Sequence, residues 1–381
     1  MLNPGPHAPT PGRGSSVAQR SDAPARAGFL RRASAAALRT PSRTRQFPGS
    51  RWTACASACD TTRVAAAEVA NEDVRSPSVR AGALSFALQG VDVKHLPLLA
   101  RCLTGPVLRH VLEGGRSAFL AEAFRITRAD EKLGGDATLL TAAQAIFELV
   151  SRRYRSDYVY RTAIANKIFL GRHSPATTAL LSELRVWRCK ADLVMLNGTS
   201  TAYEIKTELD NFDRLAAQIA AYSRMFDRIF VVTYEDQVKH LQSCLPDFVG
   251  IITLSEAFTL RVRRDAASNA HNVHVPTVLD ALRRGELVEL TRRICGAVPS
   301  VSGVQLVGEC TRLLLAQNCP RKVHDEMVVL LKKRRTFSRQ DFDHVPRELV
   351  PAYLDSGIAS RDWPRLTAIL ANTTVKEALH Q

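Results

Sequence analysis

Three side chains in the middle of the chain combine two carboxylates with an amine. Asp192 begins an apolar strand pattern, and Glu204 and Lys206 lie two residues apart in the next one. Because alternate residues of a strand point to the same face, Glu204 and Lys206 share a face. Asn197-Gly198, between the two patterns, is a strong hairpin signal. A loop centred near Gly198 brings Asp192 opposite Glu204, and a register slipped by one residue still leaves the two carboxylates neighbours. The sequence therefore predicts two carboxylates and a lysine at one end of a hairpin.

This grouping suits the hydrolysis of a phosphodiester. Paired carboxylates bind Mg²⁺ or Mn²⁺, which are hard ions that prefer oxygen ligands. Such an ion lowers the pKa of a bound water and stabilises charge on the phosphate. A neighbouring ammonium orients that water and balances charge in the transition state. A Glu-Ile-Lys sequence alone is more often a solvated strand face, so the prediction depends on the hairpin and on Asp192.

The elements around these residues alternate between helix and strand. Helices are expected over 137–154 and over Tyr158–Leu170, the second ending at Gly171. The expected strands are Leu184–Cys189, Asp192–Leu196, Thr201–Thr207, Arg228–Thr233, Val249–Thr253 and Thr259–Arg263, with a helix over Asn211–Phe226 after the third. This order predicts an α/β fold, in which helices flank a mixed central sheet and helical extensions lie at both ends.

The 381 residues divide into four expected segments. Residues 81–155 are expected to be helical, 156–265 to form the core that holds the site, and 270–381 to be helical again. Residues 1–80 are rich in Pro, Arg, Ser and Ala and lack apolar periodicity, which predicts a disordered basic tail. This tail is a phosphate-binding arm, an organellar presequence or the product of a mis-assigned start codon. The last is favoured because no methionine follows Met1 before Met195.

The net charge of +15 suggests nucleic acid only weakly once its distribution is considered. Residues 1–50 hold eight arginines and a single acid, Asp22, so nearly half of the excess lies in the tail. The remainder is mildly basic, which fits DNA as a partner without requiring it. The sequence contains no run of eighteen or more apolar residues, so no membrane span is expected. The eight cysteines include no CxxC pair, which predicts buried free thiols in a reducing cytoplasm.

The motif residues also resemble a known superfamily. Ala191–Val194 followed by Tyr203–Lys206 is similar to the split Asp…Glu-x-Lys signature of PD-(D/E)XK nucleases, which have the restriction-endonuclease-like fold. Gln218 and Tyr222 resemble the Gln-x-x-x-Tyr motif of the exonuclease-like branch, and their spacing puts both on one helix face. Leu181–Thr233 as a whole is similar to a bacterial and phage family of unknown function with this core.

The resemblance implies a Mg²⁺-dependent or Mn²⁺-dependent nuclease that acts on DNA. In the roles that it implies, Asp192 and Glu204 bind the metal ion and Lys206 orients the attacking water. Gln218 and Tyr222 would lie beside the site and help to position the nucleic acid. These roles and the fold are expectations that rest on the resemblance.

A third carboxylate is the part of the pattern that the sequence does not supply directly. Many members of the superfamily add a Glu from the first helix, but Tyr158–Leu170 contains no acid. Glu183, nine residues before the first carboxylate, is the expected substitute. The alternative for Glu183 is a surface pair with Arg185 or Lys190. Glu208, at the end of the third strand pattern, is a weaker candidate, since an acid at the start of a helix is favourable on its own.

Two other functions fit the same residues. A nuclease fold can bind nucleic acid without cleaving it, for example as a regulator of a mobile element. A helical protein–protein adaptor with an incidental sheet is the weaker alternative. The presence of all three of Asp192, Glu204 and Lys206 favours the enzyme, because sites that have lost activity usually lack one of these groups.

Overall fold

The computed structural model describes residues 85–334 and 337–380. The tail expected over residues 1–80 lies outside the described residues, as do Cys55 and Cys59. The other six cysteines are free. No helix in these ranges combines the length and the apolarity needed to cross a bilayer.

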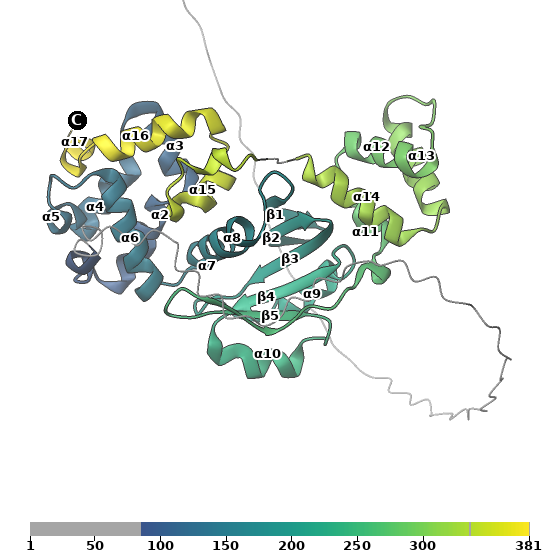
Figure 1. Cartoon of the computed structure of the whole chain (residues 1–381), viewed down its shortest axis with the longest axis horizontal. Helices are drawn as coiled ribbons and strands as arrows, with labels where there is room; N and C mark the ends of the chain where they lie inside the picture. Colours follow the sequence, from purple (N-terminus) through teal and green to yellow (C-terminus); the bar gives the residue numbers. More distant parts are fainter. Residues whose placement is uncertain (1–84, 335–336, 381) are drawn as a thin grey trace, which may run out of the picture. The chain divides into compact units, whose positions relative to one another are not determined.

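A six-stranded sheet whose strand order follows the chain lies at the centre of the described residues (Figure 1). β3, β4 and β5 run parallel to one another, and the other three neighbouring pairs are antiparallel. The strands are β1 (Ala179–Val186), β2 (Cys189–Asn197), β3 (Thr199–Ile205), β4 (Arg228–Thr233), β5 (Gly250–Leu254) and β6 (Leu260–Arg264). The α/β class with a mixed sheet is therefore confirmed.

The hairpin of β2 and β3 sets the register of the candidate site. Leu193 pairs with Tyr203, the last pair of this ladder. Gly198 forms the turn with a φ of 71°, a conformation that only glycine adopts without strain. The next two residues in register are Asp192 and Glu204, so the hairpin predicted from Asn-Gly brings the two acids opposite each other.

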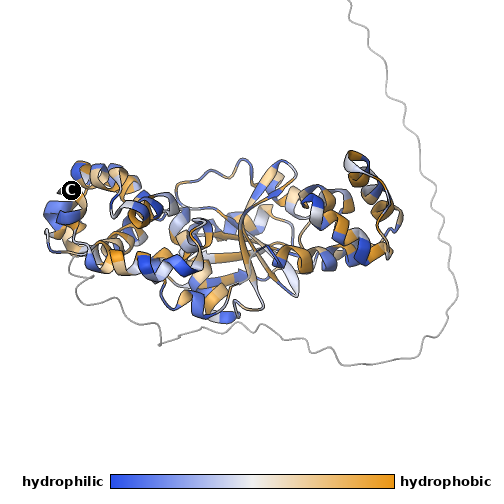
Figure 2. Ribbon diagram, turned by 90° about the horizontal axis from the view of Figure 1, so that it is seen from above, coloured by the Kyte–Doolittle hydropathy of each residue, from blue (hydrophilic) through white to orange (hydrophobic). Residues whose placement is uncertain are grey.

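Helices cover both faces of the sheet. On one face, α7 (Asp157–Ile164) continues through a π-helical turn (Ala165–Phe169) into α8 (Leu170–Arg172). The buried residues of α7 share one apolar cluster with alternate residues of β2, β3 and β4. On the other face, α9 (Leu215–Tyr222) contributes to a second cluster with the remaining strand residues. Figure 2 shows the hydrophobic strands between these helical layers. Each face of the sheet thus packs against a separate hydrophobic core.

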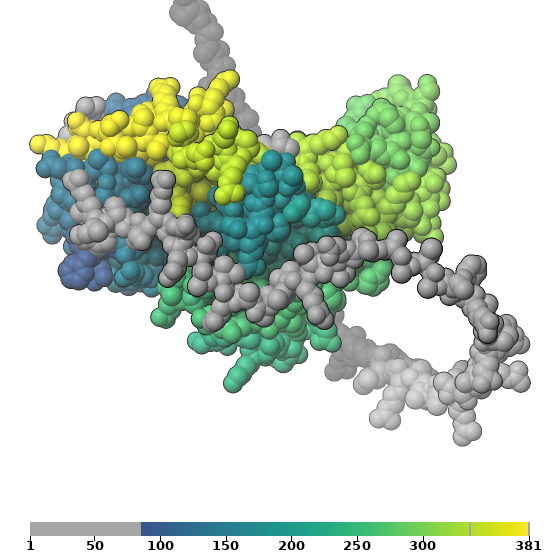
Figure 3. Space-filling model, in the orientation of Figure 1, coloured from purple at the N-terminus to yellow at the C-terminus, as the bar shows by residue number. Residues whose placement is uncertain are grey.

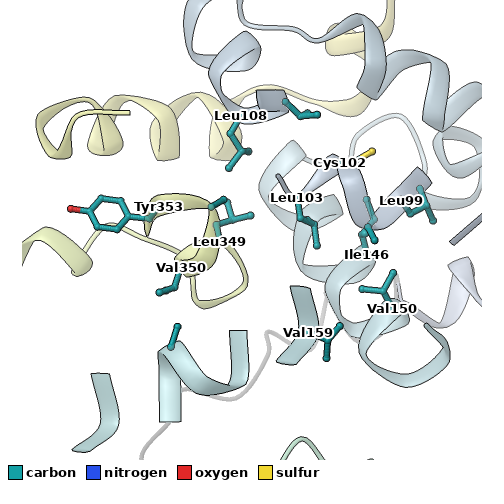
Figure 4. Close-up of a cluster of buried hydrophobic side chains, with 14 of the residues drawn as sticks. Leu99, Cys102, Leu103, Leu108, Ile146, Val150, Val159, Leu349, Val350 and Tyr353 are labelled. Atoms are coloured by element: carbon teal, nitrogen blue, oxygen red, sulfur yellow. The ribbon is translucent and has the colours of Figure 1, made fainter. Parts of the chain in front are cut away.

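The first cluster also joins helices from the two ends of the described chain. They are α2 (Leu96–Cys102), α3 (Gly105–Gly114), α4 (Ala118–Thr127), α5 (Ala129–Leu133), α6 (Leu139–Arg153), α15 (Val350–Asp355), α16 (Trp363–Asn372) and α17 (Val375–His380). The short 3-10 turn η1 (Val93–His95) precedes α2. Figure 4 shows Leu103 and Ile146 in the same cluster as Leu349 and Tyr353. In Figure 3, C-terminal residues in yellow lie against N-terminal residues in blue. The boundary expected near residue 155 therefore falls inside one apolar core.

A separate helical group packs with α9 in the second cluster. It consists of α11 (Val275–Ala281), α12 (Arg284–Cys295), α13 (Gly303–Ala316) and α14 (Pro320–Lys332), and α14 contacts β2 and β3. α10 (Val238–Cys244) contacts β5. Short 3-10 turns complete the described chain at η3 (Glu235–Gln237), η4 (Ala270–Asn272), η5 (Gln340–Phe342), η6 (Arg347–Leu349) and η7 (Ser360–Asp362).

One predicted strand is in fact a tight turn between two strands. The pattern at Leu184–Cys189 predicts a single strand, but the chain reverses at Trp187 and Arg188. Val186 pairs with Cys189 across this turn. The prediction was wrong because the two-residue turn contains neither glycine nor proline. Without such a turn signal, the alternating apolar residues on its two sides have the pattern of one continuous strand.

Two predicted helix limits also differ. The helix expected over Asn211–Phe226 covers only Leu215–Tyr222. Before it, the Asp210 carboxylate accepts hydrogen bonds from the backbone N–H and the hydroxyl of Thr207, so it closes a turn and does not cap the helix. The helix expected to end at Gly171 continues for one more residue, because the π-helical turn shifts the hydrogen-bond pattern along the chain.

Candidate functional site

Glu204 and Lys206 form a buried ion pair at the end of β3. The Lys206 Nζ lies 2.8 Å from Oε1 of Glu204, whose side chain is 1% exposed. Removing two charges from water is costly, and their attraction offsets that cost only when the geometry is good. Lys206 is held in place because its backbone N–H donates to Val232 and its carbonyl accepts from the hydroxyl of Thr233, both on β4.

Asp192 lies beside this pair and shares its environment. The Asp192 Oδ2 accepts a hydrogen bond of 2.8 Å from the backbone N–H of Ile205. The side chain is 26% exposed. Burial, together with the negative charge of Glu204, raises the pKa of Asp192 to about 6. The charge of Glu204 beside Asp192 favours a cation at this position. The predicted grouping of Asp192, Glu204 and Lys206 is present in the fold.

An irregularity in the first two strands points the Asp192 side chain toward β3. Leu181 and Leu184 are three residues apart, yet both belong to the second apolar cluster, and so do Ala191 and Val194 on β2. Regular alternation cannot place such residues on one face. Glu183, between the two leucines, has a φ of 51°. The strands therefore twist locally at the position of the aspartate, and the carboxylate is free to bond the end of β3.

Tyr222 on α9 is the second partner of Glu204. Its hydroxyl lies 2.7 Å from Oε2 of Glu204 and 2.6 Å from the carbonyl oxygen of Lys190. The hydroxyl has one proton, so it donates to one of these acceptors at a time. Burial and the Glu204 charge raise the pKa of Tyr222 far above its usual range, so the hydroxyl stays protonated. The resemblance to the Gln-x-x-x-Tyr motif thus identified a residue that contacts the carboxylate itself.

Replacing Tyr222 with phenylalanine tests this contact. Tyr222→Phe keeps the ring in its core position but removes the side-chain hydroxyl that bonds the buried Oε2 of Glu204. We expect a loss of about 1–3 kcal/mol in the free energy of unfolding, the usual penalty for an unsatisfied buried acceptor. Urea unfolding measures it. Tyr203→Phe is the matched control, because Tyr203 is also buried but stacks on Phe230. Equal stability of both variants would contradict the assigned bond.

Gln218, one helical turn before Tyr222, has an unsatisfied side-chain oxygen. Its Oε1 is buried and accepts no hydrogen bond from any residue in the described ranges. A buried acceptor without a donor is costly. Within the described residues, the Gln218 side-chain oxygen therefore lacks a donor that a water or a ligand would supply.

The first helix does carry an acid, so the prediction that it has none was wrong. α7 begins at Asp157, one residue before the predicted start. Partial burial is the main cause that raises the pKa of Asp157 to about 6, and the charge of Asp192 adds to it while Arg161 opposes it. The missed signal was Ser156-Asp157 directly before an apolar pattern, a common start of a helix.

Arg161 connects three acids from separate parts of the chain. Its Nε donates to Asp157 at 2.6 Å, and its guanidinium lies 3.5 Å from Asp355 of α15. It also lies 4.0 Å from Oδ1 of Asp192. Arg161 thus supplies positive charge to Asp192, as Lys206 does to Glu204.

The other two predicted acids have separate partners. Glu183 pairs with Lys190 at 3.0 Å, and both side chains are exposed, which is the surface pairing considered as the alternative. Glu208 accepts a hydrogen bond of 3.0 Å from the hydroxyl of Tyr160 and pairs with Arg155 at 3.3 Å. In residues 85–334 and 337–380, no three His, Cys, Asp or Glu side chains are grouped to hold a metal ion by themselves.

A second series of hydrogen-bonded polar side chains has the residue types of a hydrolase triad, but its serine is not accessible to a substrate. The Ser200 Oγ lies 2.8 Å from Nε2 of His324, and Nδ1 of His324 lies 2.9 Å from Asp325. Ser200 and His324 are fully buried. The Ser200 oxygen already accepts the backbone N–H of Asp227. No substrate can reach this serine, so the group fastens α14 to β3.

The comparisons with known proteins concern the region that contains this site. Residues 151–349, a little more than half of the chain, match the family described as bacteriophage P4 protein cII. The chain belongs to this family. The matched cII-family region begins just before α7 and includes the whole sheet and α9 to α14. A phage family was also the resemblance drawn from Leu181–Thr233.

The chain was also compared with solved structures and with curated proteins. The chain is similar to a protein of unknown function from Silicibacter pomeroyi, with 17% sequence identity, a coverage of 28% of this chain and 69% of that one, and a TM-score of 0.23. A likeness of this size carries no argument about the cII-family fold. No curated protein matches the chain.

Proposed function

We propose that this chain is a metal-dependent nuclease with a restriction-endonuclease-like core and that it hydrolyses DNA. The observation that carries the proposal is the juxtaposition at the end of the hairpin. The Asp192 carboxylate accepts the N–H of Ile205, the residue after Glu204, and Glu204 is bonded to Lys206. A pair of acids with a lysine, on a sheet covered by helices on both faces, is the arrangement that the PD-(D/E)XK resemblance implies.

The donor atoms fit a hard divalent cation. Asp192 and Glu204 offer carboxylate oxygens, and Mg²⁺ is commonly bound by one or two carboxylates with water in its remaining positions. Burial and the charge of Glu204 raise the pKa of Asp192, which agrees with a site that receives a cation. When bound, Mg²⁺ or Mn²⁺ supplies charge stabilisation on the phosphate and an acidified water.

The protein's own groups would perform the remaining tasks. The Lys206 ammonium, which bonds Glu204, is placed to orient a water by donating a hydrogen bond to it and to balance negative charge in the transition state. Tyr222 keeps Glu204 oriented from α9. Asp157 and Arg161 stand on the other side of Asp192 and set its charge environment.

Cleavage of defined DNA forms tests the proposal. Purified full-length protein is incubated with linear single strands, linear duplex and supercoiled plasmid, in Mg²⁺, in Mn²⁺ and in EDTA. We expect metal-dependent cleavage of at least one form, reduced about a hundredfold or more in Glu204→Gln. Glu204→Gln is close in shape and keeps an acceptor for Tyr222. Activity that persists in EDTA or that is equal in Glu204→Gln would overturn the proposed mechanism.

One observation favours the alternative of a binding module without catalysis. Each acid already has a cationic neighbour from the protein, Arg161 for Asp192 and Lys206 for Glu204. If the protein is such a binding module, nucleic acid binds without a metal ion. Titration calorimetry with Mn²⁺ then gives no binding heat that depends on Asp192 and Glu204. The family takes its name from a bacteriophage protein, which is the mobile-element setting that this alternative assumes.

A further inference from the structure

The turn between β1 and β2 presents an exposed aromatic ring among arginines. Trp187, at the tip of this turn, is 49% exposed. The guanidinium carbon of Arg188 lies 5.0 Å from its ring centre, and that of Arg224, which follows α9, lies 5.6 Å away. A large exposed tryptophan is uncommon on a soluble surface and marks a binding site more often than a leucine does.

The backbone holds the ring in this exposed position. Trp187 has a φ of 53°, a left-handed conformation that is rare for a bulky residue and costs free energy. The Nε of Arg185 donates to the carbonyl oxygen of Trp187 at 3.3 Å and fastens the turn. The strained turn thus holds the ring half-exposed at the surface.

The surrounding charge is positive and not neutralised. Arg185, Arg188 and Arg224 are exposed. Within the described part of the chain, none of the three forms an ion pair with a carboxylate. Three unneutralised guanidinium groups around one aromatic ring favour a ligand that combines a flat ring with negative charge.

The platform adjoins the candidate site. Trp187 lies in the turn just before β2, and Asp192 is the fourth residue of β2. Three residues of strand, roughly 10 Å at about 3.3 Å per residue, separate Cys189 at the start of β2 from Asp192. Between them, the carbonyl oxygen of Lys190 bonds the Tyr222 hydroxyl, which also bonds Glu204. α9 thus carries Tyr222 to the acids and ends just before Arg224 at the ring. A strand of nucleic acid that stacks on Trp187 would extend toward the acids over a few nucleotides.

We propose that Trp187, with Arg185, Arg188 and Arg224, is a stacking platform for single-stranded nucleic acid. This inference rests on the proposed nuclease function and gives its substrate class. A base stacks on the indole and takes the place of a guanidinium, which then meets the adjoining phosphate. Duplex DNA keeps its bases stacked on one another, so it cannot use the ring in this way. Stacking on an aromatic side chain contributes about 1–3 kcal/mol per base.

Binding in EDTA tests the platform without requiring cleavage. Fluorescence anisotropy with labelled oligothymidine and with a duplex of equal length measures Kd for the full-length chain. We expect Trp187→Ala to weaken single-strand binding by about 5- to 150-fold, which is the stacking contribution expressed as a ratio. Trp187→Phe should retain most of the affinity, and duplex binding should change less than about threefold. Phe86→Ala, at another strongly exposed aromatic residue, is the matched control.

Salt dependence separates the arginines from the ring. In Arg188→Ala and Arg224→Ala, the slope of log K against log salt for the single strand should fall by about 0.7 for each lost phosphate contact. In Trp187→Ala, the slope of log K against log salt should stay unchanged. Unchanged single-strand affinity in Trp187→Ala, or equal losses for single strand and duplex, would overturn the platform. If the natural protein cleaves DNA but Trp187→Ala binds the single strand as tightly as before, only the platform is contradicted. If the natural protein binds single strands through Trp187 but cleaves no DNA, only the nuclease function is contradicted.

Discussion

Replacing Lys206 with methionine is expected to abolish metal-dependent cleavage and to destabilise the fold. The loss of the ammonium should lower the cleavage rate about a thousandfold, since a positioned group of this kind contributes about 10²–10⁴. It also leaves the carboxylate of Glu204 buried without its cation. Breaking a buried ion pair from one side usually costs about 3–5 kcal/mol. Urea unfolding and a cleavage assay on the same preparation measure the two effects.

Two further variants separate chemistry from folding. In Glu204→Gln with Lys206→Met, neither residue of the pair carries a buried charge, so most of the lost stability should return while cleavage stays absent. Lys190→Met removes the same kind of ion pair at the surface, where Lys190 meets Glu183, and should cost less than about 1 kcal/mol. Full cleavage by a folded Lys206→Met protein would remove Lys206 from the mechanism.

Replacing Asp192 with asparagine is expected to remove divalent-cation binding and to stabilise the metal-free protein at alkaline pH. The folded state raises the pKa of Asp192 to about 6, from 3.8. The stability that comes from this group is therefore fully present below about pH 4 and is lost as pH rises through 6. Asparagine does not titrate, and its side-chain oxygen can still accept the N–H of Ile205. We expect a gain of about 1–2 kcal/mol at pH 8 and little change at pH 4.

Thermal unfolding with and without Mn²⁺ measures both effects. Added Mn²⁺ should raise the Tm of the natural protein, because a ligand of the folded state stabilises it by mass action, and it should leave Asp192→Asn unchanged. Asp136→Asn, at an exposed aspartate in the loop before α6, is the control. An Asp192→Asn protein that is less stable than the natural one at pH 8 contradicts the proposed repulsion between the two acids.

The local pattern of the sequence was sufficient for the hairpin that organises the site. Asn197-Gly198 is a turn signal with a physical cause, and it fixed the register that brings Asp192 opposite Glu204. The i, i+4 spacing of Gln218 and Tyr222 likewise placed both residues on α9, where Tyr222 meets Glu204. These predictions needed only short-range geometry.

The parts that the sequence did not yield depend on contacts between distant residues or on backbone strain. The contact of Arg161 with Asp355 joins segments almost two hundred residues apart, and no local pattern indicates it. The turn at Trp187 requires a left-handed tryptophan, which turn statistics would reject. Asp157 was missed by one residue, since helix ends are the least certain limits in any sequence pattern.

The apolar core that joins both ends of the described chain has a consequence for synthesis on the ribosome. Residues of α2 and α6 pack against Leu349, Trp363 and Leu370. During translation, the early helices leave the ribosome with their apolar faces uncovered, and the residues that cover them follow roughly two hundred residues later. The protein therefore cannot complete this core until residues 349–378 have emerged from the ribosome. Until then the exposed leucines are natural binding sites for chaperones that recognise apolar chain segments.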